Sequence, residues 1–155
     1  MTAGTTAGAA AGADPRLPFF VYGTLRPGEC NHDLLLRGRT VLEEPARLPG
    51  ALLFDGPGYP YAVEASGAGP VLGEIVHPAP GHYAALLASL DHLEEYAPDD
   101  PSSLYLRVAR HVVRPDGVRV RAWVYLAADR VARELRAVGR PIPGGDWRAA
   151  RLRDG

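Results

Sequence analysis

The chain has 155 residues, 46% of them hydrophobic and 23% charged, and its 17 basic and 18 acidic side chains give a formal net charge of −1. These values are typical of one globular domain that buries its own core, and they exclude a wholly disordered protein. The near-neutral charge gives no reason to expect nucleic acid or an anionic membrane as a partner. Nine arginines and four acids gather in residues 119–155, a pattern that a solvated helix face explains more simply than an anionic partner does.

A single cysteine, Cys30, excludes a disulfide within the chain and a cysteine-rich zinc site. The sequence has no run of about 18 apolar residues, and its first fifteen residues lack the basic start and apolar stretch of a secretory signal. We therefore expect a cytoplasmic protein. Residues 1–15 are small and nearly featureless, so we predict a disordered tail there and a single domain over residues 16–155.

The predicted ordered part begins with a short apolar strand, rich in aromatic residues, over residues 17–22. This strand ends at Gly23, and a loop with glycines at both ends follows over residues 23–28. We expect Asn31 to cap a short helix that stops at Gly38.

Three further extended regions follow in the first half of the chain. Residues 40–54 contain extended pieces, which we expect to be interrupted at Pro45 and again at Pro49-Gly50. Residues 59–63 resume an extended path, and Pro60 places it at the edge of a sheet because proline cannot donate to a central ladder. Residues 71–77 are predicted as another strand.

The second half of the chain begins with the clearest helix, predicted over residues 81–96 between flanking prolines. Two strongly alternating stretches, residues 104–113 and 118–126, are joined by a turn and predict a β-hairpin. A second helix is expected over residues 129–138, and no element is predicted in the tail that follows. Strands joined by turns, with few helices, predict an α+β fold on a mainly antiparallel sheet that closes in a barrel-like manner.

One acidic residue of the first predicted helix falls on its apolar side. At about 100° per residue, Glu94 lies inside the apolar stripe centred on Leu90, whereas Asp91 and Glu95 lie outside it. A carboxyl group in apolar surroundings has a raised pKa and can take and return a proton, as general acid–base catalysis requires. The alternative is that Glu94 bends into solvent at the last turn or pairs with an arginine.

The loop that follows the first strand is a second candidate site. Successive main-chain N–H groups in a turn can hold a carboxylate or phosphate, and Gly23 allows a ligand to come close to the main chain. An ordinary turn is the alternative reading. The loop matches neither the phosphate-loop pattern nor the three spaced glycines of dinucleotide-binding proteins.

Other reactive residues give weaker indications of a site. Cys30 is expected to be a small buried hydrophobic residue rather than a nucleophile. The five histidines form no ligand pair, so no metal is expected. Trp123 and Tyr125 share a strand face with arginines, which could stack on a base, but a half-exposed sheet face explains them as well.

The two candidate sites together resemble the gamma-glutamylcyclotransferase-like family. The resemblance rests on the strand and loop over residues 21–28, on Leu90-Asp91-His92-Leu93-Glu94-Glu95-Tyr96, on Tyr105-Leu106-Arg107 and on the strand Ala122-Trp123-Val124-Tyr125. It covers roughly residues 17–126, and Gly145-Asp146-Trp147 resembles the tail of bacterial members. The family usually has glycine where this chain has Glu95.

The resemblance implies a small mixed, mainly antiparallel β-barrel flanked by helices. It also implies an enzyme, of the C–N lyase or acyltransferase type, that converts a gamma-glutamyl amine or gamma-glutamyl amino acid to 5-oxoproline and releases the amine. Glu94 would be the general acid and base. The residues expected to bind the substrate are Tyr22, Gly23, Thr24, Leu25, Arg107 and Tyr125.

The family resemblance implies neither a cofactor nor a metal. A non-catalytic module that binds a small carboxylate or amine in the same pocket is the alternative. A third reading is an interaction domain that uses the basic residues 119–155. The oligomeric state is not predicted.

Overall fold

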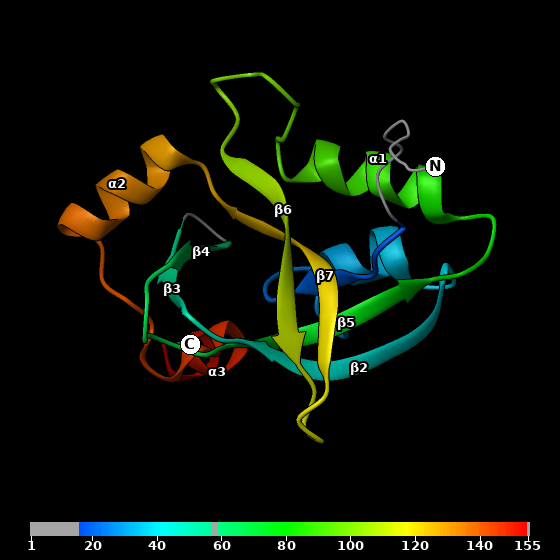
Figure 1. Cartoon of the computed structure of the whole chain (residues 1–155), viewed down its shortest axis with the longest axis horizontal. Coiled ribbons are helices and arrows are strands. Elements are labelled where there is room, and N and C mark those ends of the chain that lie inside the picture. The colour runs from blue at the N-terminus through cyan, green and yellow to red at the C-terminus, as the bar shows by residue number, and fades with distance from the viewer. Residues whose placement is uncertain (1–15, 57–58, 155) are drawn as a thin grey trace, which may run out of the picture.

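The structure is a computed structural model that describes residues 16–56 and 59–154 (Figure 1). The predicted tail over residues 1–15 lies outside the described residues. The strands are β1 (Phe19–Val21), β2 (Thr40–Leu48), β3 (Ala51–Asp55), β4 (Pro60–Glu64), β5 (Val71–Pro78), β6 (Tyr105–Val113) and β7 (Arg119–Ala127). The helices are α1 (Tyr83–Leu93), α2 (Asp129–Val138) and α3 (Trp147–Asp154), with the short turns η1 (His32–Leu36) and η2 (Pro143–Gly145).

Five strands close into a barrel in the order β1-β5-β2-β6-β7. β1 is antiparallel to β5 and parallel to β7, and the other pairings in the barrel are antiparallel. β3 and β4 form a separate two-stranded sheet, and Figure 1 shows α1 and α2 on different sides of the barrel. The predicted α+β fold, a mixed and mainly antiparallel barrel with flanking helices, is confirmed.

The two faces of β7 pack against different parts of the core. Val124 belongs to a cluster with Ile75 of β5, whereas Trp123 and Tyr125 belong to the cluster that contains Leu90 of α1. This division follows from the period of two along a strand. Because both faces are buried here, the interpretation of Trp123 and Tyr125 as part of a half-exposed sheet face is wrong.

β2 runs without a break through Pro45, where the sequence analysis expected an interruption. Pro45 lies opposite Glu74 of β5, and β2 pairs with β5 along its whole length. On its other side β2 pairs with β6 only at Arg47. At Pro45, β2 therefore has a hydrogen-bonded neighbour on one side only. A strand tolerates proline there, because the missing N–H costs no hydrogen bond to a second neighbour.

The tail after α2 also contains structure that the sequence analysis did not predict. α3 starts at Trp147, which is buried in the barrel core. The side chain of Asp146 accepts a hydrogen bond from the N–H of Ala149 at 3.1 Å and so caps the first turn of this helix. Besides Trp147, Arg148 holds the start of α3, because its guanidinium donates to the main-chain carbonyl of Pro27 and its Nε lies 3.3 Å from a carboxylate oxygen of Glu29.

β1 lies close to β5 because Gly73 has no side chain. A Cβ atom at Gly73 would lie 2.1 Å from the main-chain oxygen of Val21 and 2.9 Å from the ring of Phe20. Both of these residues belong to β1, whose C-terminal end leads directly into the loop that contains Gly23. The position of this loop therefore depends on the close approach at Gly73.

We expect the substitution Gly73→Ala to lower the free energy of unfolding by about 2–3 kcal/mol, because an added methyl group overpacks the contact between β1 and β5. Gly117→Ala is the control, since its added Cβ would meet nothing within 4 Å and only its positive φ of 88° is unfavourable. That strain costs about 1 kcal/mol. Urea unfolding measures both values, and an equal or smaller loss at Gly73 would contradict this account.

Candidate functional site

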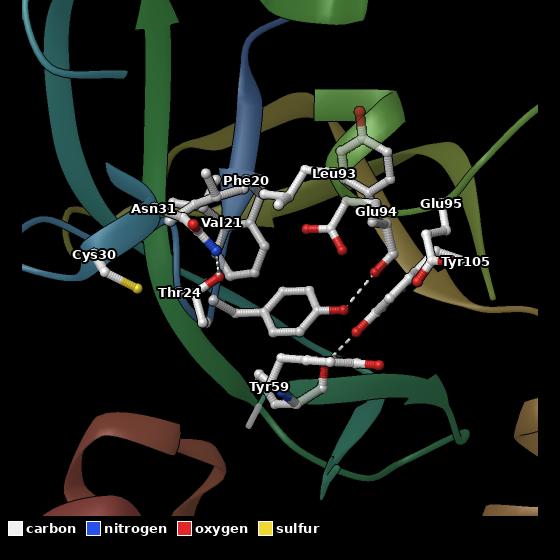
Figure 2. A pocket seen from close by; sticks show the side chains of 15 residues that line it. Phe20, Val21, Thr24, Cys30, Asn31, Tyr59, Leu93, Glu94, Glu95 and Tyr105 are labelled. Atoms are coloured by element: carbon white, nitrogen blue, oxygen red, sulfur yellow. Dashed lines mark hydrogen bonds between the residues drawn. The ribbon is translucent and has the colours of Figure 1, made fainter. Parts of the chain in front are cut away.

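A pocket of about 250 Å³ lies between the loop after β1, the end of α1 and the β4 end of the small sheet (Figure 2). The following residues line it: Phe20, Val21, Tyr22, Gly23, Thr24, Leu25, Cys30, Asn31, Tyr59, Pro60, Leu93, Glu94, Glu95, Tyr105 and Tyr125. Both candidate sites from the sequence analysis thus meet in one pocket. Arg107 is the one residue expected to bind substrate that does not line it.

Glu94 is positioned by the way in which α1 ends. The helix stops earlier than the predicted residue 96, because Glu95 has the left-handed φ of 51°. The N–H of Glu95 donates to the carbonyl of His92 at 3.1 Å, and the N–H of Tyr96 donates to the carbonyl of Asp91 at 2.9 Å. This pair of bonds is the Schellman motif, and it makes Glu94 the residue at the C-cap.

Glu94 is half-buried, and Figure 2 shows its carboxyl group pointing into the pocket. Among the described residues no arginine or histidine forms an ion pair with it. Burial raises the pKa of Glu94 from 4.5 to about 7, because removing a carboxylate from water penalises its charged form. The carboxyl group can therefore lose or gain a proton near neutral pH.

The loop after β1 presents its main chain to the pocket. In the part of the chain that the structure describes, the N–H groups of Gly23, Thr24 and Leu25 have no hydrogen-bond acceptor. The side chain of Thr24 accepts a hydrogen bond from Asn31 Nδ2 at 2.8 Å, and its carbonyl accepts one from the N–H of His32 at 3.2 Å. Thr24 thus helps to hold the loop, while three successive N–H groups remain free for an anionic ligand.

Asn31 acts differently from the sequence prediction. It was expected to cap the following helix, but its side chain makes no capping hydrogen bond to η1. Instead its side chain donates a hydrogen bond to Thr24 and lines the pocket.

Cys30 was expected to be buried, and this prediction is wrong, because Cys30 is exposed and lines the same pocket.

Arg26 fixes this loop to the barrel and to the C-terminal helix. Its Nε and Nη2 donate to the two carboxylate oxygens of Glu74 at 2.9 and 3.1 Å, and its Nη1 donates to Asp146 at 3.0 Å. Arg26 is only 7% exposed, and these partners raise its pKa against the effect of burial. Its planar guanidinium suits this two-oxygen contact.

Asp91 connects α1 to β6 and β7 next to the pocket. The sequence pattern had placed it outside the apolar stripe of the helix. It is half-buried and accepts hydrogen bonds from Arg107 Nε at 3.0 Å and from the hydroxyl of Tyr125 at 2.6 Å. The guanidinium of Arg107 also lies 4.4 Å from the ring centroid of Trp123. Arg107 therefore holds Asp91 and Tyr125 in place, where the sequence analysis expected it to contact substrate.

The buried tyrosines of the pocket use their hydroxyl groups in the scaffold. Tyr22 donates to the main-chain carbonyl of Tyr125, and Tyr105 donates to the carbonyl of Pro60 at 2.7 Å. Burial raises the pKa of Tyr22, Tyr105 and Tyr125 above the ordinary value of 10, and the nearby Glu94 adds to this effect. These phenols stay protonated, so Glu94 is the lining group that titrates near pH 7.

Tyr59 and Tyr105 line the pocket, although neither was among the residues predicted to bind substrate. Tyr105 shares a strand face with Arg107, and this alternation was the available signal. Tyr59 precedes β4, and no local pattern indicates that the start of β4 lies against the loop that contains Gly23. Within residues 16–56 and 59–154 no group of three metal-ligating side chains is found, and no helix is long and apolar enough to cross a membrane.

Comparisons with known proteins agree with this fold. The family model described as gamma-glutamyl cyclotransferase, AIG2-like, matches residues 19–149. A protein of Niallia circulans, gamma-L-glutamyl-butirosin B gamma-glutamyl cyclotransferase, is 34% identical over 108 residues, which are 69% of this chain and 64% of that relative. The match thus spans less than two thirds of the relative's length.

Solved structures are similar to the chain as well. A mouse AIG2-like protein has a TM-score of 0.56 at 26% identity, covering 72% of this chain and 77% of that one. The Bacillus subtilis protein YkqA has a TM-score of 0.64 at 25% identity, covering 89% of this chain and 42% of that one. These matches confirm the resemblance found in the motifs: the chain belongs to the gamma-glutamyl cyclotransferase, AIG2-like family.

Proposed function

We propose that the chain is an enzyme that converts a gamma-glutamyl amide to 5-oxoproline and a free amine. One observation carries this proposal: a carboxyl group without a cationic partner, with a pKa near 7, points into a pocket lined by free main-chain N–H groups. The Niallia circulans relative is named as a cyclotransferase for a gamma-glutamyl compound, which supports the same substrate class.

The reaction needs little from the protein because both reacting groups belong to the substrate. The α-amine attacks the γ-carbonyl carbon, so a new C–N bond forms and closes a five-membered ring. The original amide C–N bond then breaks and the amine departs. Binding the substrate in a folded conformation brings the two groups together, which supplies much of the rate enhancement.

Glu94 moves the one proton that the reaction requires. Its carboxylate takes a proton from the attacking α-nitrogen, and the resulting acid returns a proton to the leaving nitrogen. A pKa near 7 suits both steps, because neither form of the group is strongly favoured at neutral pH. This scheme uses no metal, cofactor or nucleophile from the protein.

The loop over Gly23, Thr24 and Leu25 stabilises negative charge in this scheme. Its N–H groups would hold the α-carboxylate of the substrate or the oxyanion that develops on the γ-carbonyl oxygen. The ion pairs of Arg26 keep the loop in place before the substrate arrives, so little reorganisation is needed.

A binding module without catalysis would use the same pocket, and a carboxylate at Glu94 could pair with the ammonium of an amine ligand. Such a module would need a carboxylate that stays ionised, with a low pKa, whereas burial raises the pKa of Glu94 to about 7. The state of Glu94 therefore favours the enzyme.

We expect Glu94→Gln to lower kcat about 10³-fold, because general acid–base catalysis contributes roughly 10²- to 10⁴-fold. Substrate binding should largely remain, since glutamine keeps the shape of the side chain. Mass-spectrometric detection of 5-oxoproline measures turnover, and calorimetry measures binding. Glu134→Gln, an exposed change on α2 outside the pocket, is the control. Near-normal turnover by the Glu94 variant would refute the mechanism.

The pH dependence of the wild-type enzyme tests the same group. Because Glu94 acts first as a base, kcat/KM should rise with pH and reach half of its plateau near pH 7. A steady-state profile from pH 4 to 9 measures this directly. A half-maximal value near pH 4.5 would instead indicate an ordinary exposed carboxyl group.

The raised pKa of Glu94 should also make the free energy of unfolding depend on pH. Between pH 4.5 and 7 the folded state keeps a proton that the unfolded state has lost, so the stability of the wild type falls as pH rises through this range. Glutamine cannot ionise, and we expect Glu94→Gln to be more stable than the wild type by about 3 kcal/mol at pH 8, because each unit of pKa shift corresponds to about 1.4 kcal/mol. At pH 4.5 the difference should nearly vanish. Urea unfolding at both pH values measures it, and a difference that does not change with pH would count against a raised pKa.

A further inference from the structure

We propose that the amine part of the substrate carries a second positive charge, and that Glu95 recognises it at one end of the pocket. This inference rests on the proposed function and narrows it to one substrate class. It favours gamma-glutamyl derivatives of diamines and other polycationic amines. It disfavours gamma-glutamyl amino acids, whose amine part carries a carboxylate.

The first support is the charge of the pocket. Among the described residues that line it, only Glu94 and Glu95 have charged side chains, and both are acidic. A gamma-glutamyl group brings one α-ammonium, which Glu94 would meet, and one α-carboxylate, which the N–H groups of residues 23–25 would meet. The negative charge of Glu95 is then left for the rest of the substrate.

The position of Glu95 fits this role. Figure 2 shows Glu95 and Tyr105 at one end of the pocket, with Asn31 and Cys30 at the other end. The loop that contains Thr24 lies on the side of Asn31, to which Thr24 is hydrogen-bonded. If the glutamyl carboxylate lies at the loop, the leaving amine faces the end where Glu95 lies.

The size of the pocket leads to the same arrangement. Its volume of about 250 Å³ is below the roughly 300–1,000 Å³ of sites that enclose a drug-sized ligand. The glutamyl group and the amide therefore occupy most of it, and a longer amine extends toward the surface. Glu95 is exposed there, and within the described chain it has no cationic partner.

Aromatic rings add a second feature that suits an ammonium group. Tyr59 and Tyr105 both line the pocket, with ring centroids 6.5 Å apart. Tyr61 stacks on Tyr105 at 4.9 Å; burial and Tyr59 raise the pKa of Tyr61, and the negative charge of Glu95 raises it further. Glu95 thus lies within electrostatic reach of an aromatic group, and ring faces with a carboxylate nearby attract cations.

The backbone at Glu95 provides independent support. Its φ of 51° lies in the left-handed region, which costs a side-chain-bearing residue about 1 kcal/mol and costs glycine nothing. Glycine would therefore end α1 more favourably. The side chain at this strained position places a carboxylate in the lining of the pocket, which glycine would not do.

The test compares three gamma-glutamyl amides of similar length. Their amine parts are 1,4-diaminobutane with a terminal ammonium, pentylamine with a terminal methyl group, and 5-aminopentanoic acid with a terminal carboxylate. We expect kcat/KM for the cationic amide to exceed that for the neutral one about fivefold, as one partly exposed ion pair provides. The anionic amide should be the poorest substrate, and 0.5 M salt should reduce the differences.

Substitution of Glu95 should abolish this preference. In Glu95→Gln the ratio of kcat/KM between the cationic and neutral amides should fall to about one, and in Glu95→Arg the anionic amide should become the better substrate. Glu134→Gln removes the same charge from α2, outside the pocket, and should keep the wild-type ratio. Thermal unfolding verifies that each variant is folded.

The outcomes separate the two proposals. A gamma-glutamyl α-amino acid, gamma-glutamylalanine, is assayed beside the three amides. If the wild type releases 5-oxoproline from none of these four compounds, the proposed function is wrong, and this inference falls with it; if it releases 5-oxoproline from gamma-glutamylalanine alone, the proposed function stands and the inference is overturned. If it releases 5-oxoproline from all three at equal efficiency, or if Glu95→Gln keeps the wild-type ratio, the proposed function stands and the role of Glu95 is overturned.

Discussion

The pocket depends on one carboxyl group that the protein buries without a counter-charge. Arg26, Arg107 and Arg110 each pair with an acid on or near the barrel, whereas Glu94 has no such partner among the described residues. Its pKa therefore rises through desolvation alone. A single arginine beside Glu94 would lower its pKa again. The site therefore depends on these arginines being paired with other acids as much as on Glu94 itself.

The scaffold holds this group by geometry. The Schellman turn ends α1 at the residue that points into the pocket. Asp91, on the same helix, anchors that end to β6 and β7 through Arg107 and Tyr125. On the opposite side, Arg26 and the close contact at Gly73 hold the loop after β1. Two rigid supports thus face each other across a small space, which is what a preorganised site requires.

Polar groups around the pocket are divided between support and function. The hydroxyls of Tyr22, Tyr105 and Tyr125 and the side chain of Thr24 are all engaged in the scaffold. In the described pocket the N–H groups of Gly23, Thr24 and Leu25 and the two glutamates remain available to a ligand. Main-chain donors bind an anion without a positive charge, so the pocket keeps a negative character that neutralisation by arginine would destroy.

Local periodicity in the sequence determined much of this protein by itself. The alternation along β6 and β7, the end of α2 at Gly139 and the angle of Glu94 relative to Leu90 all follow from neighbours in sequence. Tertiary structure decided the rest. Asp91 meets Arg107, Arg26 meets Asp146, and Tyr59 reaches the pocket only because the barrel closes and the small sheet lies beside it. Contacts between residues far apart in sequence depend on strand order and register, and neither leaves a periodic signal in the residues themselves.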